Sequence, residues 1–319
     1  MTIPFAKPAG LLCIALLTAC GGGGASGSNP VTGGVQLVAT DPVDPTDPTV
    51  ALTNGIPTEL ANNLLGVTYD PGNQTLTLEL ESFDAAGEQA TFLRRSDLDP
   101  TVNGYQAYVR QDDPSDRFFL AIGGSSVGGE VSAVVVTDGG QFNRFFGGGF
   151  YQQDSTYEVD REQGLVSYAG NYAGTTNINA PGTNLATPLP VAAVRPREPA
   201  AIQGDIFLNV TFSDDSVNGS IFNRRFTDYP TIDLPDISLV EGELAEDGTF
   251  LGSAEIEVER PIGRFGGTLG GEGGTALAGT TSLTEFSDDL ENEEEYGLFV
   301  LERCGTANEN ATLCANVNP

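Results

Sequence analysis

The stretch DIFLNVTFS, residues 205–213, decides the fold class of this 319-residue chain. Apolar side chains at positions 206, 208, 210 and 212 alternate with polar side chains at 205, 209, 211 and 213. A period of two residues is typical of a β-strand that buries one face. Asp214 and Asp215 follow, so the chain is expected to turn there and return as a second strand over 216–223.

The same alternation, interrupted by tight turns, continues on both sides of this hairpin, and no segment has a convincing helical period. Asp247-Gly248 suits a primed hairpin turn, and Asp70-Pro71-Gly72-Asn73 suits a type II turn. From residue 164 onward we expect eight strands, at about 165–173, 204–213, 216–223, 237–245, 249–258, 262–269, 275–284 and 295–302.

Eight strands are enough to close a small antiparallel up-and-down barrel, which is either filled by its own side chains or holds one small ligand. The fold class is therefore all-β, with a C-terminal eight-stranded barrel and an N-terminal β-rich handle region. The strands of the handle region are expected over about 66–151. An aromatic cluster is expected to pack between the two β-regions, and it consists of Phe145, Phe146, Phe150 and Tyr151.

The N-terminus has the pattern of an exported lipoprotein. Residues 9–17 are mainly apolar but too few to span a bilayer, which fits a signal peptide over 1–19. Leu17-Thr18-Ala19-Cys20 fits a lipobox, and cleavage would leave Cys20 first; an ordinary signal peptide with a coincidental cysteine is the alternative. Two or more acyl chains on Cys20 would make a stable membrane anchor.

The rest of the chain divides by composition. Residues 20–55 are rich in Gly, Pro and Asp and are expected to form a flexible leash. The N-terminal β-region is expected over 56–160, the barrel over 161–303 and a C-terminal tail over 304–319.

The cysteines agree with export. Cys13 would leave with the signal peptide and Cys20 would carry lipid, so that Cys304 and Cys314 remain as a pair in an oxidising compartment. We predict a disulfide that fastens the tail. Two free thiols or a metal pair are the alternatives, and no histidine is present to complete a metal site.

Composition excludes most catalytic chemistries. The formal charge is −30, the chain has no His, and the only Lys is Lys7 in the predicted signal peptide. Ser-His-Asp triads and the usual zinc sites need His, and the phosphate-binding P-loop needs Lys. The strong negative charge also opposes binding to nucleic acid, whose backbone is negatively charged. The GEGGTA run at 271–276 fits the G-x-G-x-x-A fingerprint of dinucleotide binding, but that fingerprint must open a helix and here it leads into a strand pattern. From all these absences we predict no enzyme, no cofactor and no metal.

Carboxylates leave two alternatives open. Pairs of acids could support glycoside hydrolysis, because their geometry is invisible in a sequence. The acidic residues at 288–295 could bind Ca²⁺, although a solvated loop is the simpler interpretation. Asp97-x-Asp99-x-Thr101 begins like a Ca²⁺ loop but lacks the later Gly and Glu.

Two long loops are the candidate partner-binding elements, because recognition in barrels usually lies on loops and uses Arg and Tyr. The loop at about 175–203 is Pro-rich, and the loop at about 224–236 follows the second strand of the first hairpin. Isolated surface arginines that pair with nearby acids are the alternative interpretation. The candidate residues are Arg195, Arg197, Arg224, Arg225 and Tyr229.

Four motifs, in this order, resemble the barrel of the transferrin-binding protein B family of surface lipoproteins, which includes factor H binding protein. The motifs cover residues 164–302 and are GLVSYAGNYAG at 164–174, LNVTFSDDSVNGSI at 208–221, GRFGGTLGG at 263–271 with AGT at 278–280, and YGLF at 296–299. The resemblance implies a single-barrel member with a surface-binding role. None of the family's ligand-contacting residues can be matched, so it implies no particular ligand.

These observations favour an exported lipoprotein, anchored in the outer membrane at the cell surface or the periplasmic face. It would bind an unknown protein or small molecule without catalysing a reaction, and the resemblance suggests a role in iron or nutrient acquisition. A carboxylate-based envelope hydrolase and a structural envelope protein are the alternatives.

Overall fold

The computed structural model describes residues 50–82, 89–154, 157, 159–186, 194–257 and 260–317. Strands dominate this part of the chain, and its helical elements are short. None of the described helices is long and apolar enough to cross a bilayer. The predicted signal peptide, the lipidation site Cys20 and nearly all of the predicted leash lie outside the described residues.

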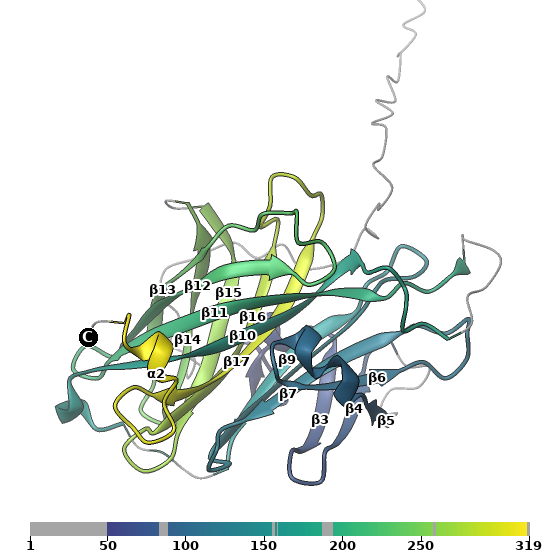
Figure 1. The fold of residues 1–319 in the computed structure, drawn as a ribbon. Helices are drawn as coiled ribbons and strands as arrows, with labels where there is room; N and C mark the ends of the chain where they lie inside the picture. The colour runs from purple at the N-terminus through teal and green to yellow at the C-terminus, as the bar shows by residue number, and fades with distance from the viewer. Residues whose placement is uncertain are drawn as a thin grey trace, which may run out of the picture.

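Eight C-terminal strands form a closed antiparallel barrel in which each strand pairs with the next in sequence (Figure 1). The first strand, β10, also pairs with the last, β17, with Ala173 opposite Leu298. The predicted all-β fold with an eight-stranded barrel is confirmed. The strands are β10 (Leu165–Asn179), β11 (Pro199–Thr211), β12 (Ser216–Phe226), β13 (Ile237–Leu244), β14 (Thr249–Ile256), β15 (Arg260–Gly270), β16 (Ala276–Thr284) and β17 (Glu294–Arg303).

Seven upstream strands form a second antiparallel sheet, in the order β3 to β9. The backbone N–H of Asn63, just before β3, donates to the carbonyl of Gly147 in β9 (3.1 Å), which nearly closes this sheet. Its elements are β3 (Leu64–Asp70), β4 (Thr75–Leu80), β5 (Gln89–Arg94), η1 (Ser96–Val102), β6 (Gln106–Arg110), β7 (Phe119–Ser125), β8 (Val131–Asp138) and β9 (Gly147–Gln153). The strands β1 (Leu52–Thr53) and β2 (Ile56–Pro57) and the helix α1 (Thr58–Ala61) precede it, and η2 (Arg161–Gln163) follows it.

The barrel is filled by its own side chains. Phe212, Phe250, Phe265 and Phe299 are fully buried within one hydrophobic cluster, and burial of each such side chain contributes about 2–3 kcal/mol. Gly279 makes room for this packing, because a Cβ there would lie 2.5 Å from the Phe299 ring. Of the two interiors that eight strands allow, the structure has the packed one.

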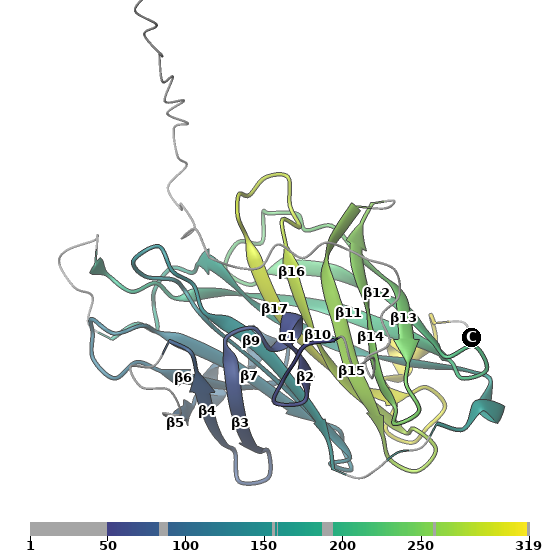
Figure 2. The ribbon, with the colours of Figure 1, turned by 180° about the vertical axis from the view of Figure 1, so that it is seen from behind.

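The barrel wall made by β10, β16 and β17 packs against β8 and β9 of the sheet, an arrangement visible from both sides (Figure 1, Figure 2). The predicted aromatic cluster contributes in part. Phe145 packs on Tyr296 of the barrel with ring centroids 6.2 Å apart, and Tyr151 belongs to the same interfacial cluster. Phe146 instead packs against the core of the sheet.

Strands β10 and β11 both extend into the first predicted loop. β10 continues to Asn179 and β11 begins at Pro199. The predicted loop at 175–203 is therefore shortened to residues 180–198.

The described tail after β17 contains one helical turn, α2 (Ala311–Cys314), which contacts β10 of the barrel. Cys304 and Cys314 form a disulfide with their Cα atoms 5.5 Å apart, which confirms the predicted pair. The Cys304 N–H donates to Ser167 O of β10 (2.9 Å), so the tail is fastened to the barrel wall at this point.

Candidate binding site

A cavity of about 170 Å³ lies where the sheet and the barrel meet, and we call it the junction cavity. It lies between η1 and β7 on the sheet side and the start of β11 on the barrel side. It is smaller than a typical small-molecule site of about 300–1,000 Å³, so it suits a single side chain. Its lining residues are Leu98, Thr101, Val102, Phe118, Leu120, Thr183, Asn184, Glu198, Pro199, Ala201 and Asp228.

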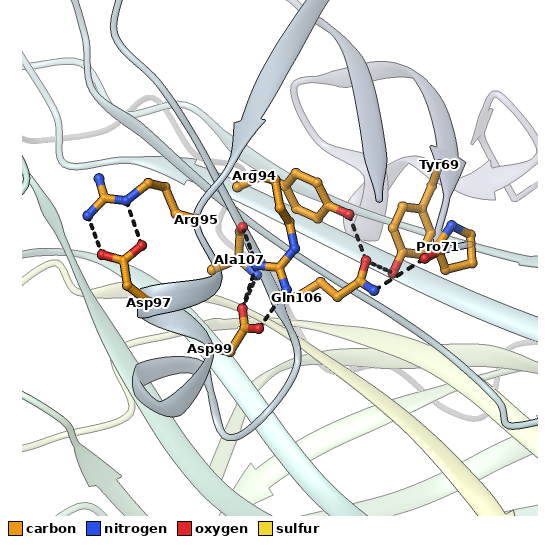
Figure 3. A network of polar contacts seen from close by, with 9 residues as sticks. Tyr69, Pro71, Arg94, Arg95, Asp97, Asp99, Gln106 and Ala107 are labelled. Atoms are coloured by element: carbon orange, nitrogen blue, oxygen red, sulfur yellow. Dashed lines mark hydrogen bonds and ion pairs between the residues drawn. The ribbon is translucent and has the colours of Figure 1, made fainter. Parts of the chain in front are cut away.

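Ion pairs hold η1 in place beside this cavity. Arg94 Nη1 and Nη2 donate to the two carboxylate oxygens of Asp99 (2.6 and 2.5 Å), and Asp99 also accepts from the Ala107 N–H (3.0 Å). Figure 3 shows this arrangement and the neighbouring pair of Arg95 with Asp97. The carboxylates of Asp97 and Asp99 are therefore both paired with arginines. The run Asp97-x-Asp99-x-Thr101 holds η1 in place instead of forming a Ca²⁺ loop.

The junction cavity is acidic. Glu198 is only 8% exposed and accepts hydrogen bonds from the backbone N–H (3.0 Å) and the side-chain amide of Asn184. Asp228 lies on the loop after β12, and burial raises the pKa of its carboxyl. No lining residue is basic. The cavity therefore favours a cationic group over an anionic one.

The predicted arginines of the first loop come shortly before a cavity residue in the sequence. Arg195 is exposed and Arg197 is half-buried, and both precede the cavity residue Glu198. The predicted residue Tyr229 follows Asp228, and its hydroxyl donates to the carbonyl of Asn179. Burial, followed by the charges of Asp228 and Glu198, raises the pKa of Tyr229. The structure thus brings both predicted loops to one end of the molecule.

The predictions for Arg224 and Arg225 need correction, because β12 continues to Phe226 and both residues lie on a strand. Arg225 is exposed and donates to Gln203 Oε1 (2.7 Å). The Arg224 side chain is fully buried and pairs with Glu295 of β17. A guanidinium enclosed in the barrel cannot contact a partner, so Arg224 is not part of the binding site.

Arg224 belongs to a polar network inside the barrel. Glu295, its partner, also accepts the hydroxyl of Tyr172 (2.6 Å), which is 2.8 Å from the Thr281 hydroxyl. Arg224 Nη1 donates to the carbonyl of Pro235 (3.0 Å). The network joins four strands and the segment before β13, so its role is structural.

The acidic segment at 288–295 is the solvated loop of the simpler interpretation only in its first part, where Asp288, Asp289 and Glu291 are exposed. Glu293, Glu294 and Glu295 are buried, and burial raises the pKa of Glu294 to about 7. Across the described ranges, one group of three potential metal-ligating residues is close enough to hold an ion, and this segment does not belong to it. That group includes the two disulfide-bonded cysteines, which have no thiolate to offer.

A hairpin tip beside the junction cavity was missed by the sequence patterns. Phe142 and Asn143 connect β8 and β9 with φ values of 55° and 57°, and Phe142 is 66% exposed. The side chain of Gln141 fastens the tip by donating to the carbonyl of Val194 (2.8 Å), next to Arg195. A bulky residue at positive φ is uncommon. Asp138-Gly139-Gly140 just before the tip is a turn signal in the sequence, but it does not indicate that the exposed residue at the tip is an aromatic one.

A shallow groove of about 320 Å³ continues from the junction cavity across the sheet and shares Phe118 and Asn184 with it. Leu93 of β5 lines this groove and is 67% exposed. The groove is lined by both polar and apolar residues, and Leu185 is a further apolar residue beside Leu93. The junction cavity, this groove and the hairpin tip together form what we call the junction face.

Glu198, the buried acid of the junction face, is placed to bind a charged group rather than to transfer a proton. Both oxygens of Glu198 already accept hydrogen bonds from Asn184. A general acid or base must instead reach a substrate proton. Apolar lining, a buried acid and exposed aromatic and basic side chains are the elements from which interfaces are built.

No known protein-family model matches this sequence, and no curated protein matches it. Solved structures of transferrin binding protein B (TbpB) resemble it. A double mutant from Haemophilus parasuis Hp5 is 12% identical with a TM-score of 0.35, and the aligned region covers 74% of this chain and 52% of that protein. The isotype 1 protein of serogroup B Neisseria meningitidis is 14% identical with a TM-score of 0.30, at 76% and 39% coverage. This chain spans about half the length of those proteins or less.

Proposed function

We propose that this chain is a non-enzymatic binding module that captures a protein partner through the junction face. The observation that carries the proposal is the convergence of segments from both β-sheets around one small acidic cavity with apolar lining. Such a cavity suits a basic side chain of a partner, whose aliphatic stem contacts the apolar residues while its charge meets Glu198 and Asp228. Fully enclosed anchors of this kind dominate binding energy.

The surface around the cavity supports a protein partner rather than a free small molecule. Phe142 and Leu93 add exposed apolar area on either side, and Arg195 adds positive charge. Aromatic and arginine side chains are enriched in the energetically dominant parts of interfaces. The two cavity carboxylates and the neighbouring arginines would together select both the charge pattern and the orientation of the partner.

The proposal includes a lipid anchor at Cys20 that holds the module at the outer membrane, on the cell surface or the periplasmic face. The lipobox pattern at 17–20 and the Gly-rich stretch after it support this placement. Mass spectrometry of the full chain expressed in a bacterium should find acyl chains on Cys20, and Cys20→Ala should remove the protein from the membrane fraction. Protease treatment of intact cells then separates surface from periplasmic exposure.

Affinity capture with the full chain tests binding at the junction face. Wild-type protein, Asp228→Asn and Phe142→Ala are compared for the proteins that each retains, with Leu165→Ala as a control because Leu165 is also an exposed apolar residue but lies at the start of β10. A specific partner should be retained by the wild type and the control and weakened roughly tenfold or more by the two junction variants. Equal retention by all four proteins, or no retained protein, would contradict the proposal.

A further inference from the structure

A second cavity, of about 300 Å³, lies on the outer wall of the barrel, away from the junction cavity, and we call it the tail groove. The sheet, the barrel and the C-terminal tail each provide one wall. Its lining comes from the turn that follows η1, from β10 and β17 of the barrel, and from the tail just before α2. Figure 1 shows α2 on this tail. Its lining residues are Asn103, Gly104, Tyr105, Ala169, Gly170, Asn171, Val300, Glu302, Asn308, Glu309 and Asn310.

Hydrogen bonds fix the sheet wall of the groove against the barrel wall. The Tyr105 hydroxyl donates to Asn171 O (2.7 Å) and accepts from the Val300 N–H (3.0 Å). Asn103 Nδ2 donates to the carbonyls of Tyr172 (3.0 Å) and Gly204 (2.8 Å). The Tyr105 ring therefore holds a fixed position in the groove and supplies an aromatic surface there.

The tail wall is held by the disulfide and by the capping of α2. Asn310 Oδ1 accepts from the Leu313 N–H (3.2 Å), and Glu309 Oε2 accepts from the Gly305 N–H (2.6 Å). The disulfide between Cys304 and Cys314 closes the loop that contains these residues. The third wall is therefore held by a covalent bond that lies outside the barrel strands, except that Cys304 directly follows β17.

The polar groups that remain available in the groove include both donors and acceptors. Within the described residues, Asn308 and the Nδ2 group of Asn310 have no hydrogen-bond partner, and neither do the Oδ1 atoms of Asn103 and Asn171. Amides present both kinds of group, and carboxylates present acceptors. A ligand that satisfies this lining must carry several donors and acceptors on a small frame.

Charge and geometry argue against anionic ligands and metal ions in this groove. No basic residue lines the groove and the chain carries a charge of −30, which disfavours anions. Glu302 and Glu309 do not belong together to any group of metal-ligating residues found in the described part of the chain. The volume corresponds to the small end of ordinary ligand sites, about 300 Å³. We propose that the tail groove binds one ring of a neutral saccharide, with Tyr105 against the ring and the asparagines on its hydroxyl groups.

Titration of the full-length protein with glucose and with N-acetylglucosamine, followed by saturation-transfer NMR, tests this proposal. At least one sugar should bind with a Kd of about millimolar, as expected for few exposed hydrogen bonds. Asn171→Ala and Asn308→Ala should each weaken binding roughly tenfold, because each removes about one hydrogen bond to the ligand. The double variant Cys304→Ser with Cys314→Ser should weaken binding similarly by releasing the tail wall.

The control is Asn218→Ala, because Asn218 is an exposed asparagine on β12 that does not line the groove. It should bind as the wild type does, and circular dichroism should show that every variant keeps its strands. The proposal is overturned if neither sugar binds the wild type, or if Asn171→Ala and Asn308→Ala both leave the affinity unchanged. It is also overturned if Ca²⁺ displaces the sugar stoichiometrically. Since the junction face is not involved, failure here leaves the proposed protein capture standing.

Discussion

Replacing Arg224 with methionine tests the buried ion pair in the barrel. The side chains of Arg224 and Glu295 are both 0% exposed. Methionine keeps much of the volume but leaves the Glu295 carboxylate with the hydroxyl of Tyr172 as its remaining partner. Removing one member of a buried pair costs about 3–5 kcal/mol. At about 2–4 °C per kcal/mol, the midpoint of thermal unfolding should fall by roughly 6–20 °C.

Thermal and urea unfolding followed by circular dichroism measure this change at one fixed pH. Arg225→Met is the matched control, because the neighbouring Arg225 is exposed on the same strand; its loss should cost about 1 kcal/mol or less. Adding Glu295→Gln to Arg224→Met removes the unpaired charge and should restore most of the lost stability. The reasoning is refuted if Arg224→Met unfolds within about 1 kcal/mol of the wild type, or if the double variant is no more stable than the single one.

Three further changes have defined outcomes. The folded-state pKa of Glu294, about 7, exceeds its ordinary value of 4.5, so this carboxyl lowers stability as pH rises between these values. Glu294→Gln should therefore stabilise the protein by roughly 2 kcal/mol at pH 8 and hardly at pH 4, which unfolding at both pH values checks. Reduction of Cys304–Cys314 should cost about 2–3 kcal/mol and expose the tail to protease before the barrel; simultaneous cleavage of both would contradict this. Gly279→Ala forces a Cβ against Phe299 and should cost about 1–3 kcal/mol in urea unfolding; an unchanged midpoint would show that the wall adjusts.

The strand pattern of the barrel could be predicted because alternation has a period of two, and a buried face makes that period visible. The hairpin around 205–213 is confirmed as β11 and β12 on this basis. The alternating apolar residues of this hairpin, such as Ile206 and Leu208, are buried in the barrel interior as the pattern predicts. The disulfide could be predicted because only two cysteines remained.

The position of Arg224 could not be predicted, because a bulge interrupts the alternation. In the pairing of β11 with β12, Gln203 lies opposite Arg225 and Asp205 lies opposite Phe222. A step of two residues in β11 therefore faces a step of three residues in β12. Asn223 has a φ of 53° at this bulge. A shift of one residue exchanges the two faces of a strand. Arg224 therefore points into the barrel and Arg225 points out, the reverse of an uninterrupted pattern.

The junction cavity and the tail groove could not be predicted for a different reason. Each is built from segments that are far apart in the sequence, such as η1 and the start of β11, and no local pattern records their contact. Asp138-Gly139-Gly140 signals a turn before the hairpin tip, but the positive φ falls on Phe142 as well, which no sequence pattern indicates.

The pairing of β10 with β17 has a consequence for how the chain reaches its folded state. The two strands are the first and last of the barrel, so the barrel cannot close until the chain up to Arg303 is present. Until then the edges of β10 and β16 are open, and open edges recruit other chains. Pairing between distant strands is also slow. A chain that stops before Glu294 is therefore expected to aggregate rather than to form a smaller barrel, and release of the complete chain sets the earliest moment of folding.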